Sequence, residues 1–125
     1  MLSINENKMQ IDFATWCDKQ PFIIEHFHVA NERQASKIQG AYLKKKGVKS
    51  GVCDHWIILQ NKVIAIELKT PDGKLSDEQK NFIAKLEKAN IPVKACYSLY
   101  EATQFVKKEV EQLRKTKGVS NESSN

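Results

Sequence analysis

The feature that most constrains this chain is the stretch GVCDHWIILQNKVIAIELK, residues 51–69. Two runs rich in strand-forming residues surround Gln60 and Asn61, which is typical of a β-hairpin with a tight turn. A symmetric two-residue loop opposes Asp54 to Glu67, and directly opposed residues have Cβ atoms about 4.5 to 5.5 Å apart. The sequence therefore predicts two carboxylates side by side at one end of an apolar hairpin.

The residues around this acidic pair indicate a chemical role for it. Because side chains alternate along a strand, Lys69 shares the face of Glu67, and the other face carries Ile64, Ile66 and Leu68, which belong in the core. Two close carboxylates repel each other unless a proton or a cation lies between them. A hard divalent cation such as Mg²⁺ prefers oxygen ligands, and a neighbouring lysine can orient a water or neutralise a phosphate. The alternative is a structural ion pair between Glu67 and Lys69, which leaves Asp54 unexplained.

The rest of the chain alternates helical and strand patterns. Apolar spacing predicts helices over residues 9–19, 31–47, 76–90 and 99–115, and strands over residues 22–30 and 93–98 besides the hairpin. The helix after the hairpin lies between two strands, which favours a parallel crossover. We expect a single α/β domain over residues 1–116 with a central mixed β-sheet flanked by helices, followed by a disordered polar tail over residues 117–125.

Composition narrows the class of protein. The 125 residues carry a net charge of +5, which favours an anionic partner such as nucleic acid, although solubility alone would also explain it. No segment approaches the roughly 20 apolar residues needed to cross a bilayer, and the N-terminus lacks the apolar centre of a secretory signal. The three cysteines are widely spaced and odd in number, which indicates reduced thiols and a cytoplasmic protein.

The histidines and a lysine cluster each allow two interpretations. His26 and His28 share a strand face and could form a zinc pair, but no third ligand of suitable spacing is evident, so we interpret them as core or surface residues. His55 is expected on the face opposite Asp54, away from catalysis. A basic cluster precedes Asp54 and is either an ordinary helix end or a contact to the DNA backbone; it consists of Lys44, Lys45, Lys46 and Lys49.

The pattern D-x(12)-E-x-K on such a hairpin resembles the PD-(D/E)XK nuclease superfamily. The wider sequence is similar to its VRR-NUC branch, the virus-type replication-repair nucleases. The segments that carry this resemblance are NE (31–32), GVKSGVCDHWII (47–58), IELKTPDGKLSDEQ (66–79) and VKACYS (93–98). The resemblance implies a restriction-endonuclease-like core and a Mg²⁺- or Mn²⁺-dependent endonuclease that cuts DNA, including branched DNA such as four-way junctions.

The resemblance also implies roles for single residues. Asp54 and Glu67 would be the central metal ligands and Lys69 the catalytic lysine. Glu32 would be an additional acid, although a carboxylate at a helix start is favoured by the helix dipole anyway. Gln79 would lie near the site, although it also completes a capping box with Ser76. Further expected contacts are the metal-facing carbonyl of Leu68 and the DNA-binding lysines Lys44, Lys45, Lys46, Lys49 and Lys74.

One departure from the family concerns the residue before the first acid. The family's Pro-Asp is Cys53-Asp54 in this chain. Because the proline shapes the backbone and does no chemistry, the change concerns loop geometry more than activity.

Two symmetric cuts in a junction are made most simply by a homodimer. The N-terminal helix with Met9, Phe13 and Trp16 offers an apolar surface for one, unless this helix instead covers the sheet. Two other functions stay open at this point. The chain could be a catalytically weak DNA-binding module, or a nuclease for flaps or linear DNA without selectivity for junctions.

Overall fold

The protein folds around a mixed sheet of four strands, as the sequence predicts. The computed structural model describes the backbone of residues 4–30 and 37–124 and the side chains of residues 5–30 and 38–116. The sheet has the order β1-β2-β3-β4, with antiparallel pairing up to β3 and parallel pairing between β3 and β4. The elements are α1 (Ile4–Asp18), β1 (Glu25–His28), α2 (Lys37–Lys45), β2 (His55–Leu59), β3 (Lys62–Leu68), α3 (Asp77–Lys88), β4 (Val93–Cys96) and α4 (Leu99–Ser124).

The hairpin has the register that the sequence predicts. Leu59 pairs with Lys62 and His55 pairs with Ile66 across β2 and β3. The turn between the strands places Asn61 at φ 58°, a left-handed conformation that asparagine tolerates better than most residues. A shift of this register by one residue would move every buried side chain to the other face of the sheet. The apolar pattern and the turn therefore fix the pairing together.

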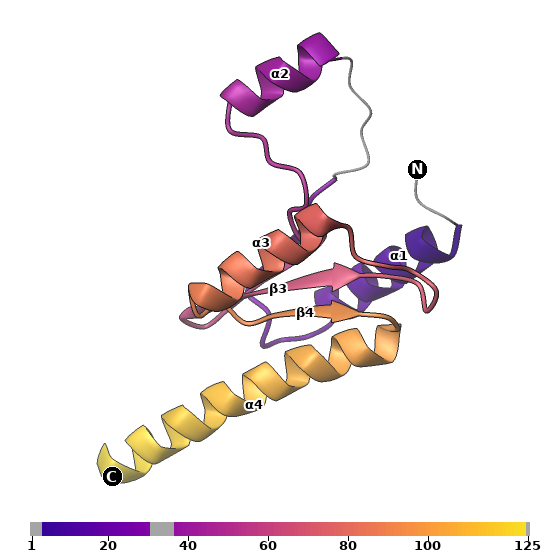
Figure 1. The fold of residues 1–125 in the computed structure, drawn as a ribbon. Coiled ribbons are helices and arrows are strands. Elements are labelled where there is room, and N and C mark those ends of the chain that lie inside the picture. Colours follow the sequence, from indigo (N-terminus) through magenta and orange to yellow (C-terminus); the bar gives the residue numbers. More distant parts are fainter. Residues whose placement is uncertain (1–3, 31–36, 125) are drawn as a thin grey trace.

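Helices cover both faces of the sheet (Figure 1). Ile57, Ile64 and Ile66 are buried on one face, in a cluster with Phe13 of α1 and Val106 of α4. On the other face α3 covers a smaller apolar cluster, whose buried members are Cys53, Ala65 and Leu86. The acidic end of the hairpin lies on this second face, because Glu67 alternates with Ile66 along β3.

The N-terminal helix takes the second of the two roles that the sequence leaves open, covering the sheet. It begins at Ile4, earlier than the predicted residue 9, and it packs on the sheet. Phe13 is fully buried, and Met9 and Trp16 pack against the same core. The apolar stripe of α1 is thus used within the chain, so the surface expected to serve a dimer is already covered.

Two further segments differ from expectation. In α2 the side chains of Ile38 and Tyr42 are 83% and 62% exposed, although their helical spacing suggested a packed face. The periodicity of a helix shows which residues share a face and does not show that a partner covers it. The helix α4 continues to Ser124, beyond the predicted end at residue 115 and across the segment expected to be disordered. No proline interrupts the chain after Pro92, so the backbone of this segment can continue the helix.

The cysteines have the state that the sequence indicates. Cys17, Cys53 and Cys96 are all buried and free. Burial raises the pKa of each of these thiols to about 12. Within the described residues, no helix combines the length and the apolar character that a membrane span requires.

Candidate functional site

The two acids of the hairpin meet as the register predicts. Asp54 lies one residue before β2, and its Oδ2 accepts a hydrogen bond of 2.9 Å from the backbone N–H of Leu68. This bond ties the loop before β2 to the end of β3. Glu67, on β3, is 1% exposed, and its carboxyl group is in hydrogen-bonding contact with that of Asp54. The hairpin therefore builds a paired carboxylate site from two backbone segments.

Burial determines the protonation of this pair. Burial raises the pKa of Glu67 to about 9, and the hydrogen bond with Asp54 and the charge of that residue act in the same direction. Burial also raises the pKa of Asp54, although the hydrogen bonds from Glu67 and the Leu68 N–H oppose this. Without a cation the pair therefore retains a proton at neutral pH. A divalent cation could take the place of that proton.

Lys69 lies directly beyond β3, half-buried beside the two acids. Its positive charge lowers the pKa of both Asp54 and Glu67, which places the ammonium within electrostatic reach of the pair. Its backbone N–H donates to the carbonyl of Cys96 at 2.9 Å, so β4 anchors this residue. A Cβ added at Gly73 would lie 3.3 Å from both Cβ and Cδ of Lys69, so the lysine stem packs closely against that turn.

Gln79 caps α3 and also contacts Glu67. Its side-chain Oε1 accepts the Ser76 N–H at 2.8 Å and its backbone N–H donates to Ser76 Oγ at 3.1 Å, which completes the capping box of α3. The other end of the same amide, Nε2, donates to Oε2 of Glu67 at 3.0 Å. The first turn of α3 therefore holds one oxygen of Glu67 in place.

A glycine brings the loop before Asp54 against the same helical turn. Gly51 has φ +82°, and a Cβ there would lie 2.4 Å from the carbonyl oxygen of Glu78. Only a residue without a side chain fits a backbone approach this close. The loop, the hairpin and α3 are consequently fixed relative to one another around the two acids.

The second carboxylate oxygen of Glu67, Oε1, indicates whether a cation fits the site. Oε1 is buried and accepts no hydrogen bond from an N–H or hydroxyl donor among the described residues, unlike Oε2, which accepts from Gln79. An unpartnered buried carboxylate oxygen is costly, and a hard cation with oxygen ligands would satisfy it. The pair therefore fits a divalent cation such as Mg²⁺ or Mn²⁺. Glu32, the third acid expected here, lies outside the described residues, and the role of the Leu68 carbonyl stays a prediction.

The predicted DNA-binding lysines are distributed over separate segments. Lys44 and Lys45 end α2, which stands away from the sheet (Figure 1), and Lys46 follows them. Lys49 lines a hollow of about 260 Å³ beside α3, together with Glu78, Asn81 and Lys85 among others. Lys74 is exposed in the loop between β3 and α3. Lys49 thus lies beside α3, the helix whose Gln79 bonds to Glu67. The α2 lysines lie away from the sheet.

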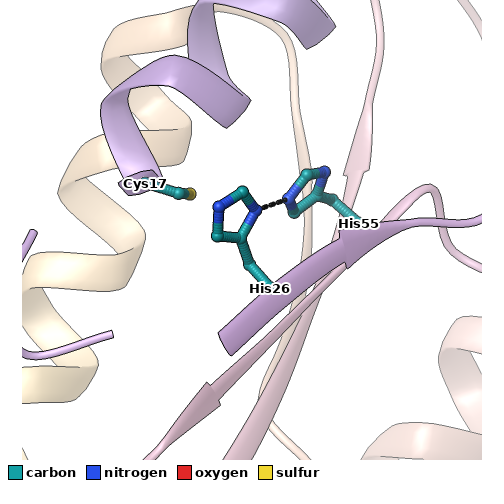
Figure 2. A group of neighbouring side chains, drawn as sticks. All are labelled: Cys17, His26 and His55. Carbon is teal, nitrogen blue, oxygen red and sulfur yellow. Dashed lines mark hydrogen bonds between the residues drawn. The ribbon is translucent and has the colours of Figure 1, made fainter. Parts of the chain in front are cut away.

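A second group of side chains lies on the opposite face of the sheet (Figure 2). One ligand atom each from Cys17, His26 and His55 lie within 4.8 Å of one another, a group that could hold a metal ion. Spacing along the chain reveals no third ligand for His26 and His28, and the fold supplies Cys17 from α1 and His55 from β2 instead. Antiparallel pairing of β1 with β2 was the missed signal, because it puts His28 directly opposite His55 and His26 on the same face.

Comparisons with known proteins agree with this architecture. The family model described as VRR-NUC domain matches residues 4–99. A solved structure described as a VRR_NUC domain protein has a TM-score of 0.71 and 18% identity, and the match covers 89% of this chain and 92% of that chain. At this identity the likeness shows a shared fold. The comparison with curated proteins found no match. Because the family model spans most of the sequence, the chain belongs to the VRR-NUC family of nucleases.

Proposed function

We propose that this protein is a Mg²⁺- or Mn²⁺-dependent endodeoxyribonuclease. The observation that carries the proposal is the buried pair of Asp54 and Glu67, in which one carboxylate oxygen accepts no hydrogen bond from a donor group among the described residues. Family membership supports nuclease chemistry, and the oxygen ligands at the end of the hairpin supply a place for the cation.

The residues around the pair would divide the work of phosphodiester hydrolysis. Asp54 and Glu67 would hold the cation, with Glu32 and the Leu68 carbonyl as further ligands. When bound, such a cation supplies Lewis-acid stabilisation of the phosphate and acidifies water. Lys69 would neutralise the negative charge that develops on the phosphate. The attacking water adds across one P–O ester bond, which leaves a phosphomonoester and a free hydroxyl.

Gln79 has a positioning role in this scheme. Its Nε2–H group fixes Oε2 of Glu67, so that Oε1 faces the remaining ligand space. Because the same amide caps α3, the helix and the carboxylate are held by one side chain. This coupling supports a site whose geometry is established before DNA arrives.

DNA is the partner that the exposed lysines support. The net charge is +5, and the four lysines of the cluster are all exposed. Replacing Lys44, Lys45, Lys46 and Lys49 together by serine should flatten the dependence of log affinity on log salt, by up to about 0.9 for each phosphate that is no longer neutralised. The matched control replaces four exposed lysines elsewhere, for which Lys8, Lys19, Lys107 and Lys115 serve. Equal slopes for the two variants would place the DNA elsewhere.

Selectivity for branched DNA, including four-way junctions, is the finer part of the proposal and rests on the family resemblance. Symmetric cuts in a junction would need two copies of the Asp54–Glu67 site, and hence a homodimer. Since α1 packs on its own sheet, the dimer would need another surface, for which the exposed Ile38 and Tyr42 of α2 are available. Light scattering at micromolar concentration should then give about twice the chain mass of 14.3 kDa.

The test is a cleavage assay on labelled linear, flap and four-way DNA, with Mg²⁺, with Mn²⁺ and with a chelator. We expect cleavage only with a divalent cation and fastest on the branched substrates. Asp54→Asn should abolish cleavage and leave DNA binding largely intact. DNA binding without any cleavage would reduce the protein to a DNA-binding module, and cleavage by a monomer that spares four-way junctions would exclude the junction-resolving function.

A further inference from the structure

The face of the sheet opposite the acidic pair carries a cluster of nitrogen and sulfur ligands (Figure 2). Cys17 comes from the last turn of α1, His26 from β1 and His55 from β2. Cys17 and His55 are each 1% exposed, and the His26 side chain is 12% exposed. Nδ1 of His26 and Nε2 of His55 are 2.9 Å apart, and the Cys17 sulfur points toward the two rings.

A carboxylate orients this cluster from the outside. Asp18 Oδ1 lies 2.5 Å from His26 Nε2, and the Asp18 side chain is 72% exposed. If Nε2 of His26 donates to Asp18, its Nδ1 carries the lone pair that faces His55. A histidine whose second nitrogen is held by a carboxylate is the usual arrangement around a bound transition metal.

We propose that Cys17, His26 and His55 bind a Zn²⁺ ion, with Asp18 orienting His26 and a water molecule in the fourth position. Thiolate and imidazole ligands suit Zn²⁺, which favours four-coordinate tetrahedral sites. Two Zn–N bonds of about 2.0 Å at the tetrahedral angle place the nitrogens about 3.3 Å apart. The two histidine nitrogens therefore need to separate only slightly to admit the ion between them.

The contacts of the His55 ring leave one of its two nitrogens without a partner among the described residues. Nδ1 of His55 is buried and has no hydrogen-bond partner among the described residues. The ring is positioned by the edge of Phe13, with ring centroids 5.1 Å apart, and by the contact with His26. Nε2, the nitrogen that lies beside Nδ1 of His26, is the one placed to bind the ion.

The ion would join α1 to two strands that the sheet already pairs. Cys17 lies on α1, and its partners lie on neighbouring strands, so bound Zn²⁺ would fasten the N-terminal helix to the sheet. Binding of Zn²⁺ here does not depend on the proposed nuclease function. The acidic pair lies on the other face and offers oxygen ligands, so the two places should select different metals.

Cobalt provides the direct test, because Co²⁺ substitutes for Zn²⁺ and gives an absorption band when a thiolate binds it. The full chain, stripped with chelator, is titrated with Co²⁺ and separately dialysed against Zn²⁺. We expect the thiolate band at one Co²⁺ per chain, its loss on adding Zn²⁺, and a higher midpoint of thermal unfolding with Zn²⁺. Absence of the band from the folded wild-type protein would overturn the proposal.

The other two buried cysteines provide matched controls. Cys96→Ala removes a thiol from the same core cluster as Cys17, and Cys53→Ala removes the thiol next to Asp54. Both variants should keep the band, whereas Cys17→Ala should lose it. His26→Gln provides the test if Cys17→Ala does not fold. Because His26 lies nearer the surface, this variant should fold, and the loss of a ligand should remove the band.

The Zn²⁺ affinity of an Asp18 variant tests whether Asp18 orients His26, because a purely structural role would leave that affinity unchanged. Asp18→Asn should keep the Co²⁺ band and lower the affinity for Zn²⁺ by about tenfold to a hundredfold. A band that disappears in Cys53→Ala and persists in Cys17→Ala would place the metal at the acidic pair and overturn the proposal.

Discussion

The end of the β2–β3 hairpin carries two polar clusters that differ in almost every chemical respect. Asp54 and His55 are neighbours in the chain, yet Asp54 contacts Glu67 on one face of the sheet and His55 contacts Phe13 of α1 on the other. The acidic face offers oxygen atoms, a lysine and the capped end of α3. The histidine face offers two imidazoles and a thiol beneath α1. A single strand end thus presents a hard and a soft ligand set, because alternate residues point in opposite directions.

Burial acts on the two clusters in the same way although their charges are opposite. Burial raises the pKa of Glu67 to about 9 and lowers the pKa of His55 to about 4. Each shift favours the uncharged form of the side chain. The difference lies in what each face can accept. The acidic face gains by binding a cation that lets both acids ionise, whereas the histidine face already holds His55 as the neutral imidazole that a transition metal binds.

The contrast between the two faces is tested most directly by replacing one residue on each face and measuring DNA cleavage. Lys69→Ala should reduce cleavage about a hundredfold to a thousandfold, because it removes a charge that stabilises the transition state. His26→Gln should change the rate less than about twofold at a temperature where both proteins are folded. Calorimetry should show that Lys69→Ala still binds the divalent cation.

Equal losses in these two variants would mean that the faces do not act independently. An active Lys69→Ala protein would return this residue to the structural ion pair with Glu67.

A smaller effect should separate the two jobs of Gln79. Gln79→Ala removes the side-chain half of the capping box and the hydrogen bond to Glu67, and we expect about tenfold to a hundredfold slower cleavage. Ser76→Ala removes the cap hydrogen bond and leaves the bond to Glu67. It should cost about 1 kcal/mol of unfolding free energy and leave the cleavage rate close to wild type. Cleavage assays and urea unfolding of both variants separate the two roles of Gln79. Equal cleavage rates for the two variants would show that Gln79 acts only as a capping residue.

The sequence predicted the acidic face better than the histidine face, for a physical reason. Two consecutive strands with a two-residue loop have a fixed register, so the opposition of Asp54 and Glu67 follows from counting. The capping box at Ser76 is equally local. The histidine face instead combines α1 with two strands that are separated along the chain by α2. Its register could be found only after deciding that β1 pairs with β2.

The exposed face of α2 shows the same limit. Ile38 and Tyr42 have the spacing of a packed helix, and no local rule shows whether the chain folds back to cover them. The contact between Gly51 and Glu78 was also beyond prediction, because it joins a loop to a helix that begins 26 residues later. Contacts of this kind depend on the whole fold and not on local pattern.

The two faces should also differ in how their stability depends on pH in the presence of a chelator. The folded-state pKa of Glu67 is raised from its ordinary value of 4.5 to about 9, so the folded protein holds this proton more tightly than the unfolded chain. Its contribution to stability is fully present below pH 4.5 and is lost as the pH rises toward about 9. The Asp54 pKa is raised as well and acts in the same direction.

His55 should act at the other end of the pH range. Its folded-state pKa is lowered from 6.5 to about 4, so only the unfolded chain takes up this proton readily between these values. Its contribution is present above pH 6.5 and is lost as the pH falls toward about 4. Each group contributes at most about 1.4 kcal/mol per pH unit within its window.

Urea unfolding of wild type, Glu67→Gln and His55→Gln between about pH 4 and pH 9 measures both contributions. The difference between wild type and Glu67→Gln should change from pH 4.5 up to about pH 9, whereas the difference between wild type and His55→Gln should change only from about pH 4 to pH 6.5. Adding Mg²⁺ should reduce the loss of wild-type stability as the pH rises toward about 9, because the cation stabilises the ionised pair, and it should leave the His55 contribution unchanged. Parallel stability curves for all three proteins would show that neither buried group titrates differently in the folded state, and the contrast between the two faces would then lie in their ligand atoms alone.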